Sequence, residues 1–267
     1  MSLARRDGIP ALMYHWVSDD LGNRLRLYGV RPRSFASQVA RLRAAGYRAV
    51  AVEDLLRHMG GEITLPPRSL VLTFDDGYAD NIENAAPILE DAGWTATIFL
   101  VTDRMGGVND WDLHHGDAPR RLMTWDDARR LDGATFRFEP HSRTHPFLDR
   151  VREDARVRDE ISGSKKRLED ELGRPAGVFS YPHGAFDARA EAMVREAGFR
   201  AAVTDLSGLN RRGTDPLRTR RTMITSRDVL PTFAFKVLTG YGMQALAVRL
   251  RRRLTGGRAP GSSRSAG

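Results

Sequence analysis

Short apolar runs alternate along the chain with segments that repeat apolar residues at the helical spacing of three and four. The apolar runs are bounded by glycine, proline and small polar residues, which is typical of buried strands. Several helical segments stop at a glycine. This alternation predicts parallel strands joined by helices, the α/β class. The predicted strands are residues 10–17, 47–52, 69–74, 95–101, 134–139, 178–181 and 199–203, and the predicted helices are 35–45, 52–59, 79–92, 124–131, 152–172 and 188–197.

The number of strand-and-helix units favours a barrel over an open sheet. A (β/α) barrel is a single domain, and 267 residues are within its usual size range. About seven units are visible, fewer than the eight of a complete barrel. We therefore expect a distorted, incomplete (β/α) barrel of about seven parallel strands in residues 1–230. Residues 106–121 show no periodicity and are predicted to form a long loop over one end of the barrel.

Positive charge is concentrated at the C-terminal end of the chain. Residues 231–267 contain six arginines and one lysine but no acidic residue. Because the net charge of the whole chain is +8, these seven charges leave +1 for residues 1–230. The nearly neutral body argues against specific nucleic-acid binding. We predict a C-terminal segment at 231–254 that is a basic helix from residue 233, and a disordered tail at 255–267.

Two interpretations of the basic helix stay open. Its apolar residues, its lysine and arginines and its lack of acids suit contact with an anionic membrane surface. They suit equally a helix that packs on the barrel with its basic end in water. No apolar run is long enough to span a bilayer, and residues 1–10 lack the apolar stretch of a secretory signal. We therefore expect a cytoplasmic protein, with peripheral contact at the inner membrane face under the first interpretation.

The sequence contains no cysteine, and this limits its chemistry. Disulfides, thiolate metal sites and a cysteine nucleophile are excluded. Any metal ion must therefore be held by nitrogen and oxygen ligands.

An acidic pair, Asp75 and Asp76, follows the predicted strand at 69–74. Two adjacent side chains of a regular strand point to opposite faces, so both carboxylates can serve one site only if the backbone leaves β geometry there. Gly77 permits such a turn. Close carboxylates repel, which favours a bound cation or a shared proton and separates the roles of the two acids. The alternative interpretation is an ordinary turn, because Asp and Gly are common turn residues.

Histidines follow other predicted strands in the same way. His141 and His145 come after the strand at 134–139, His183 comes after 178–181, and His15 lies near the end of 10–17. In a parallel barrel all these strand ends lie on one face, so the side chains should meet at one rim. Two histidines and a carboxylate suit a divalent cation, with zinc as our first choice, and the second carboxylate would be free as a general base. Taken singly, the histidines also suit a surface turn or a packed strand residue.

Three motifs in this order carry a family resemblance. They are Thr73-Phe74-Asp75-Asp76-Gly77, His141-Ser142-x-x-His145 and Tyr181-Pro182-x-Gly184. Together they resemble the motifs of the polysaccharide deacetylases of carbohydrate esterase family four, the NodB-homology domain, over about residues 9–225. The resemblance implies metal-dependent removal of an acyl group from an N-acylated sugar. By position it implies that Asp75 is the catalytic base, and that Asp76, His141 and His145 are the metal ligands.

The chain also departs from the family pattern. Ser180 and His183 stand where the family often has an arginine and an aromatic residue, so the arginine that orients the base is missing there. Arg220 and Arg221 are both open as its replacement. There is no C-terminal Leu-x-His motif for the general acid, but Met13-Tyr14-His15 resembles the corresponding segment of a permuted subgroup that includes poly-N-acetylglucosamine deacetylases. That resemblance implies that His15 is the acid.

The predicted function is hydrolysis of an N-acetyl or N-formyl group from an amino sugar in a glycan, a lipid-linked saccharide or a nucleotide-linked saccharide. The backbone N–H of His183 is predicted to share the developing oxyanion charge with the metal, since Pro182 holds that turn but has no N–H of its own. The alternative is a carbohydrate-binding protein without turnover, because the orienting arginine is missing from its usual place.

Overall fold

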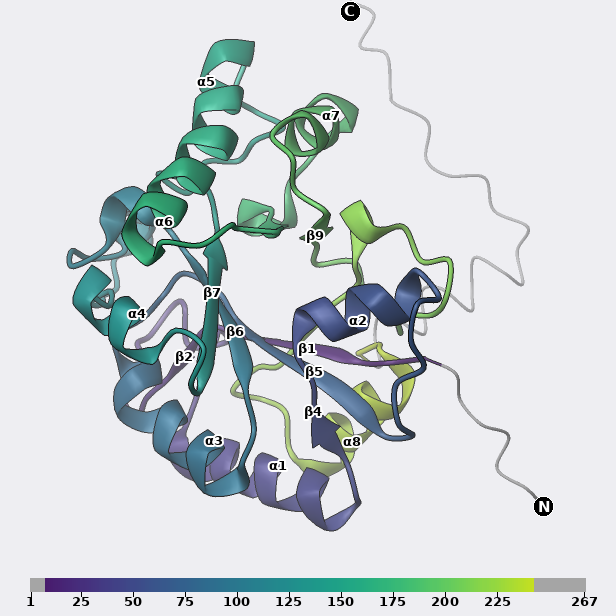
Figure 1. Cartoon of the computed structure of the whole chain (residues 1–267). Coiled ribbons are helices and arrows are strands. Elements are labelled where there is room, and N and C mark those ends of the chain that lie inside the picture. The colour runs from purple at the N-terminus through teal and green to yellow at the C-terminus, as the bar shows by residue number, and fades with distance from the viewer. Residues whose placement is uncertain (1–7, 243–267) are drawn as a thin grey trace, which may run out of the picture.

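The structure is a computed structural model that describes residues 8–242, and it confirms the α/β class with parallel strands (Figure 1). Its main sheet has the order β10-β1-β5-β6-β7, and every pairing in it is parallel. All six residues of β5 are buried, which explains why that strand is apolar without alternation. The strands are β1 (Ala11–Tyr14), β5 (Ser69–Phe74), β6 (Ala96–Leu100), β7 (Phe136–Pro140) and β10 (Thr222–Met223).

Five further strands lie outside this path. The short β4 (Arg48–Ala49) pairs with the start of β5, and β2 (Trp16–Val17) pairs with β3 (Gly29–Val30). β8 (Val178–Ser180) and β9 (Ala201–Val203) form a separate parallel pair. The number of strands in a barrel and its closure therefore remain predictions.

A carboxylate connects β7 to β8 where no backbone ladder is described between them. Glu139 is only 1% exposed and accepts hydrogen bonds from the backbone N–H groups of Gly177 and Val178, both at 2.9 Å. Buried backbone donors need an acceptor, so the side chain supplies what a neighbouring strand would otherwise provide. Glu139 is thus a structural residue at the seam between the main sheet and the β8–β9 pair.

Helices pack around the strands, and several of them start or break where the sequence analysis did not expect it. Thr124 caps α4 with a capping box, so this helix begins within one residue of its predicted start, but α1 starts at Pro32 and not at residue 35. The long helix predicted at 152–172 contains a π-helical segment, and the helix predicted at 79–92 begins with another. The helices are α1 (Pro32–Ala44), α2 (Val52–Met59), α3 (Ala86–Ala92), α4 (Trp125–Leu131), α5 (Asp154–Arg158), α6 (Ser164–Leu172), α7 (Ala188–Glu196) and α8 (Leu230–Thr239), with π-helical segments η1 (Asn81–Ala85) and η4 (Asp159–Gly163) and 3-10 segments η2 (Thr102–Arg104), η3 (Asp110–His115), η5 (Pro182–Gly184) and η6 (Pro216–Arg218).

The helix predicted at 233–254 is wrong in its bounds, because α8 ends at Thr239, where Gly240 turns the chain with φ 72°. Phe233 and Val237 of α8 are buried in the main core, so the predicted boundary after residue 230 does not separate this helix from the barrel. Residues 243–254 and the tail at 255–267 lie outside the described residues. Within residues 8–242, no helix combines the length and apolar character needed to cross a membrane.

Candidate active site

The acidic pair leaves β geometry at Asp76. The backbone N–H of Asp75 still donates to Tyr14 O at 2.9 Å, as the last bond of the β1–β5 pairing, whereas Asp76 has φ 74° and Gly77 has φ 78°. A side chain at Gly77 would place its Cβ 2.8 Å from Leu100 Cδ2, so a glycine is required there. Left-handed backbone is uncommon for a residue with a side chain, and Asp is among those that tolerate it best. This turn directs both carboxylates to one site.

Asp76, His141 and His145 form a compact group that suits a divalent cation. The Nε2 atoms of His141 and His145 lie 3.5 Å and 3.2 Å from Asp76 Oδ1, and one ligand atom from each residue lies within 4.8 Å of the others. All three residues are buried. His141 donates from Nδ1 to the backbone oxygen of Ser180 at 2.9 Å, which leaves the Nε2 lone pair for a metal. Burial also lowers the pKa of His141 to about 4, so its imidazole is neutral at pH 7.

Unpartnered polar atoms support this interpretation. Asp76 Oδ1 and His145 Nδ1 are buried and have no hydrogen-bond partner among the described residues. A buried carboxylate oxygen without a partner is costly, and a cation would remove that cost. The ligand set of two imidazoles and one carboxylate fits Zn²⁺ and other divalent metals that accept nitrogen and oxygen.

The segment that carries the two histidines is a strained turn held by a distant acid. Ser142 has φ 63° and His145 has φ 65°, and Ser142 Oγ accepts the His145 N–H at 3.0 Å. The buried carboxylate of Glu160 accepts the backbone N–H groups of Arg143 and Thr144, both at 2.9 Å. Backbone strain at a site persists when its surroundings hold it in place. Glu160 lies in a charged helical segment, and nothing in the sequence marked it as part of the site.

Arg221 supplies the guanidinium that is missing from position 180. It is fully buried and contacts both oxygens of Asp75, with Nη1–Oδ1 at 2.5 Å and Nη2–Oδ2 at 2.8 Å. Its Nη2 also donates to Ser180 Oγ at 3.1 Å, so the residue at the usual arginine position helps to place its substitute. The other candidate, Arg220, donates to the backbone oxygen of Ser207 instead. Of the two open alternatives, Arg221 is therefore the one at the site.

The fixed charge of Arg221 keeps Asp75 ionised. Burial alone would raise the pKa of Asp75, but Arg221, together with contributions from His141 and His15, outweighs it, and the pKa falls below its ordinary value. Asp205 adds a third carboxylate, with Oδ1 at 3.4 Å from Arg221 Nη2 and a side chain that is 42% exposed. A Cβ at Gly184 would lie 2.6 Å from Asp205 Cγ, so this glycine of the third motif lets Asp205 approach. Sequence reasoning did not identify Asp205.

His15 and His183 come to the same rim as the acids. Tyr14 pairs with Phe74, which places His15 beside Asp75, and the side chain of Asn81 donates to the His15 backbone oxygen at 2.8 Å. His183 has φ 57°, and its Nε2 lies 3.2 Å from the His145 backbone oxygen. Its ring stacks on Phe147 with ring centroids 3.7 Å apart. The structure thus brings together all six residues that the sequence analysis placed at the site, while their catalytic roles remain predictions.

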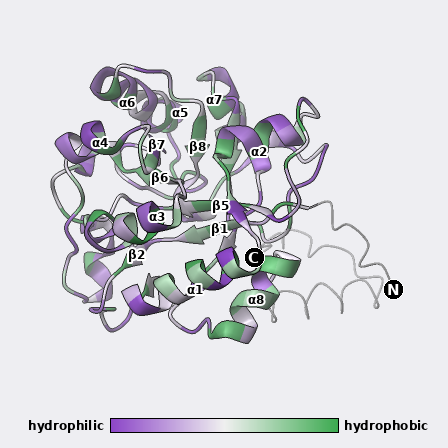
Figure 2. Ribbon diagram, turned by 60° about the horizontal axis from the view of Figure 1, so that its bottom comes forward, coloured by the Kyte–Doolittle hydropathy of each residue, from purple (hydrophilic) through white to green (hydrophobic). Residues whose placement is uncertain are grey.

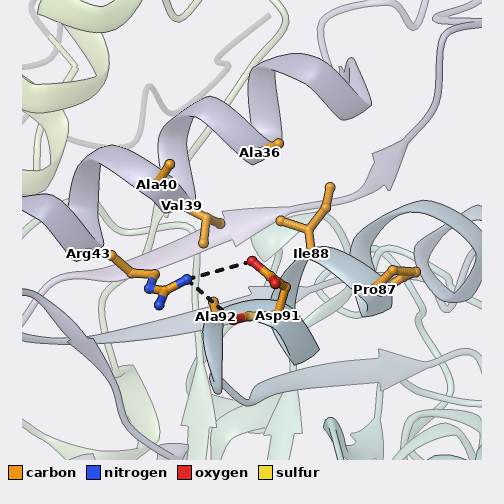
Figure 3. Close-up of a pocket in the computed structure, with 8 residues that line it drawn as sticks. All are labelled: Ala36, Val39, Ala40, Arg43, Pro87, Ile88, Asp91 and Ala92. Atoms are coloured by element: carbon orange, nitrogen blue, oxygen red, sulfur yellow. Dashed lines mark hydrogen bonds and ion pairs between the residues drawn. The ribbon is translucent and has the colours of Figure 1, made fainter.

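A separate groove lies between α1 and α3, on the outside of the barrel (Figure 3). Its lining is mostly apolar, and Arg43 spans it to reach Asp91, with Nη1–Oδ2 at 3.7 Å. None of its lining residues belongs to the rim. The groove is therefore not part of the candidate active site.

Comparison with known proteins identifies the class to which this fold and site belong. The sequence model of the polysaccharide deacetylase family matches residues 62–202, more than half of the chain, and the chain belongs to that family. His15 and Arg221 lie outside the matched segment. The Met-Tyr-His subgroup remains a prediction.

Among the relatives is YxkH of Bacillus subtilis (strain 168), which is 26% identical over 200 residues, 75% of this chain and 65% of that protein. The poly-beta-1,6-N-acetyl-D-glucosamine N-deacetylase of Escherichia coli (strain K12) is 31% identical over 129 residues, 47% of this chain and 19% of that enzyme. The chain thus spans less than two thirds of the length of these curated relatives. The solved structure of IcaB from Ammonifex degensii shares the fold, with a TM-score of 0.76 and 20% identity over 88% of this chain and 98% of that one.

Proposed function

We propose that this protein is a metal-dependent hydrolase that removes an N-acyl group from an amino sugar of a glycan. The observation that carries the proposal is the division of labour within the acidic pair. Asp76 faces two histidines that suit a metal. Both carboxylate oxygens of the adjacent Asp75 instead accept hydrogen bonds from the buried guanidinium of Arg221. Family membership and the printed name of the Escherichia coli relative support an N-acetylated glycan as substrate.

Asp76, His141 and His145 would hold the cation, for which zinc is our first choice. When bound there, such a cation would act as a Lewis acid that polarises a carbonyl oxygen and makes water more acidic. Asp75 would accept the proton of the attacking water as general base. Arg221 would fix the direction of that carboxylate, because a bidentate guanidinium contact sets the position of both oxygens.

Cleavage of the amide also requires a proton on the leaving nitrogen. His15 would supply it, so that water and the amide are converted to a free amine and a carboxylate. The backbone N–H of His183 would stabilise the developing oxyanion. The contacts of the His183 ring with Phe147 and with the His145 backbone oxygen support a role through the backbone rather than as a metal ligand.

Catalysis is favoured over binding without turnover. The non-catalytic alternative rested on the absence of an arginine at position 180, and Arg221 removes that reason by reaching Asp75 from the position just before β10. The acyl group is acetyl or formyl, and the sugar is part of a glycan or of a lipid-linked or nucleotide-linked saccharide.

A substrate panel with and without chelator tests the proposal. We expect the purified protein to release acetate or formate from at least one N-acylated glucosamine oligomer or nucleotide-linked sugar. A chelator should abolish release, and added Zn²⁺ should restore it. Asp75→Asn is the matched control, since it should bind metal and lose turnover. If the metal-loaded protein releases no acid from any member of the panel, the proposed activity is wrong.

Contact with an anionic membrane surface and residence in the cytoplasm stay proposals about location. Val229 and Leu230, at the start of α8, are 64% and 37% exposed, and α8 is mostly hydrophobic (Figure 2). Six arginines follow α8 in the sequence. Because α8 is part of the core, the control chain should end at Gly242. We expect sedimentation with anionic liposomes at low salt, weakened by high salt and by this truncation. Equal sedimentation of both chains would contradict the contact.

A further inference from the structure

Two loops come together beside the rim, and one side chain joins them. The first is residues 18–28, between β2 and β3, and the second is residues 106–121. Asp117 of the second loop accepts three backbone N–H groups of the first, from Asn23, Arg24 and Leu25, at 3.0, 3.1 and 2.7 Å. Three bonds to one carboxylate fix its position on the other loop. We call this contact the Asp117 clamp.

A second contact strengthens the same connection. Arg120 donates from Nη2 to the Asp20 backbone oxygen at 2.6 Å, and its guanidinium carbon lies 4.4 Å from the centre of the Trp16 ring. Leu25 of the first loop and Trp111 of the second both pack against the small cluster that contains Trp16. The two loops therefore form one surface.

This surface places one aromatic ring against each of two histidines of the proposed mechanism. The Tyr28 ring lies 4.9 Å from the His15 ring, and Trp111 lies 4.6 Å from the His145 ring, measured between centroids. Tyr28 is 38% exposed, and Trp111 is half-buried. Neither ring is needed for the proton transfers or the metal ligation described above.

Carboxylates lie close to these rings. Asp112 follows Trp111 in η3 and is held by the Asn109 side chain at 3.1 Å. Burial, followed by the charges of Asp112, Asp205 and Asp76, raises the pKa of Tyr28. Rings that offer apolar faces beside hydrogen-bond acceptors match a pyranose, which has C–H faces and a rim of hydroxyl donors.

We propose that Tyr28 and Trp111, joined through the Asp117 clamp, form a sugar-binding subsite that receives the pyranose ring of the amino sugar whose acyl group is cleaved. The inference rests on the proposed function, because it is that function which places the reacting nitrogen between His15 and the metal group. It adds the surface that recognises the sugar itself. The clamp matters because each loop carries only one of the two rings.

Kinetics of single variants on an N-acetylglucosamine oligomer test the subsite. Trp111→Ala and Tyr28→Ala should each raise KM about tenfold, the scale of one lost aromatic contact, with kcat and metal content within twofold of the parent. Trp111→Phe should recover most of the loss, since it keeps a ring. Asp117→Ala should raise KM as well. Leu113→Ala is the matched control, because Leu113 lies on the same 3-10 segment and is 50% exposed.

A binding measurement separates failure of the subsite from failure of the proposed function. Calorimetric titration of the oligomer into Asp75→Asn, with and without Trp111→Ala, reports sugar binding whether or not turnover occurs. Weaker binding in the double variant supports the subsite even if no deacetylation is found. Unchanged KM and unchanged binding in the alanine variants, with intact metal content, would overturn the subsite and leave the activity standing. The subsite is equally wrong if the parent protein binds none of these sugars.

Discussion

The two sides of the rim differ in what connects their strands. From β10 through β1, β5 and β6 to β7, backbone ladders join each strand to the next, and the acidic pair and His141 follow directly from these strands. Between β7 and β8 no ladder is described, and side chains connect β8 to the main sheet. On its other edge, β9 is joined to the segment before β10 by backbone hydrogen bonds, such as that from the Thr204 N–H to the Thr219 oxygen at 2.9 Å. Glu139 bonds to the β8 entrance, and Arg221 links Asp75 to Ser180. At β8, buried charged groups thus take the place of peptide hydrogen bonds to the main sheet.

This difference has an energetic consequence. A ladder bond lost at a strand end can be replaced by water, whereas removing one member of a buried ion pair leaves the other member as an uncompensated charge. Substitutions on the side-chain-connected side should therefore cost more than those of similar size on the ladder side.

The largest effect is expected for Arg221→Ala. The variant leaves Asp75 buried without its partner, which should lower the free energy of unfolding by about 3–5 kcal/mol in urea denaturation. Arg220→Ala is the matched control and should cost about 1 kcal/mol or less, because within residues 8–242 the one hydrogen bond of its side chain goes to the Ser207 backbone oxygen.

Arg221→Lys tests the same contact in a protein that keeps the charge. One ammonium group cannot hold both oxygens of Asp75, so we expect a folded protein with normal metal content and kcat lowered about tenfold or more. Equal stability of Arg221→Ala and Arg220→Ala would show that the buried pair does not connect the two sides.

Glu139→Ala should have the next largest effect. The variant leaves the N–H groups of Gly177 and Val178 buried without an acceptor, at a cost of about 2–4 kcal/mol in the free energy of unfolding. Hydrogen exchange of these two amides should accelerate more than that of the Asp75 amide, which donates to a backbone oxygen. Glu139→Gln keeps an acceptor and should be milder. Unaltered hydrogen exchange at Gly177 and Val178 would contradict the role of Glu139 in joining β7 to β8.

Local sequence patterns predicted the strands and strand ends of the ladder side better than the contacts that buried side chains make across the fold. The strand β5 and helix α2 have the predicted bounds, and the acidic pair and the two histidines were placed at strand ends by local pattern alone. Arg221 meets Asp75 across 146 positions, and Glu160 meets Thr144 across 16. Glu160 belongs to a helical segment whose sequence is typical of an ordinary charged face. Pairings of this kind depend on tertiary packing, which local periodicity does not encode.

Local signals also failed at the C-terminal helix. The apolar and basic pattern from residue 233 onward has no proline to break it, so it predicted one continuous helix. Gly240 ends α8 because its left-handed backbone lets the chain turn against Gly208, where any Cβ would come within 2.3 Å of the Gly208 carbonyl carbon. That contact depends on a loop 32 positions earlier.

The smallest expected effect concerns a buried acid on the ladder side. Burial raises the pKa of Asp80 to about 7, against the charge of Arg120 and the bond from the Val17 N–H. Between about pH 4 and pH 7 the folded protein therefore keeps a proton on Asp80 that the unfolded chain has released. The contribution of this proton to the free energy of unfolding is full below about pH 4 and is lost as the pH rises to about 7. We expect the parent to lose about 2 kcal/mol more than Asp80→Asn over that range, since the side chain is 17% exposed. Parallel pH profiles of unfolding free energy would contradict this.

The central claim is that two adjacent aspartates have separate tasks, and the same substitution at each position tests it directly. Asp75→Asn and Asp76→Asn should be purified in parallel, loaded with Zn²⁺, desalted and compared by elemental analysis, with circular dichroism to verify folding. We predict about one Zn²⁺ per chain in Asp75→Asn, as in the parent, and strongly reduced metal in Asp76→Asn. Equal metal content in the two variants, whether retained or lost, would contradict the division between a metal ligand and a base held by Arg221.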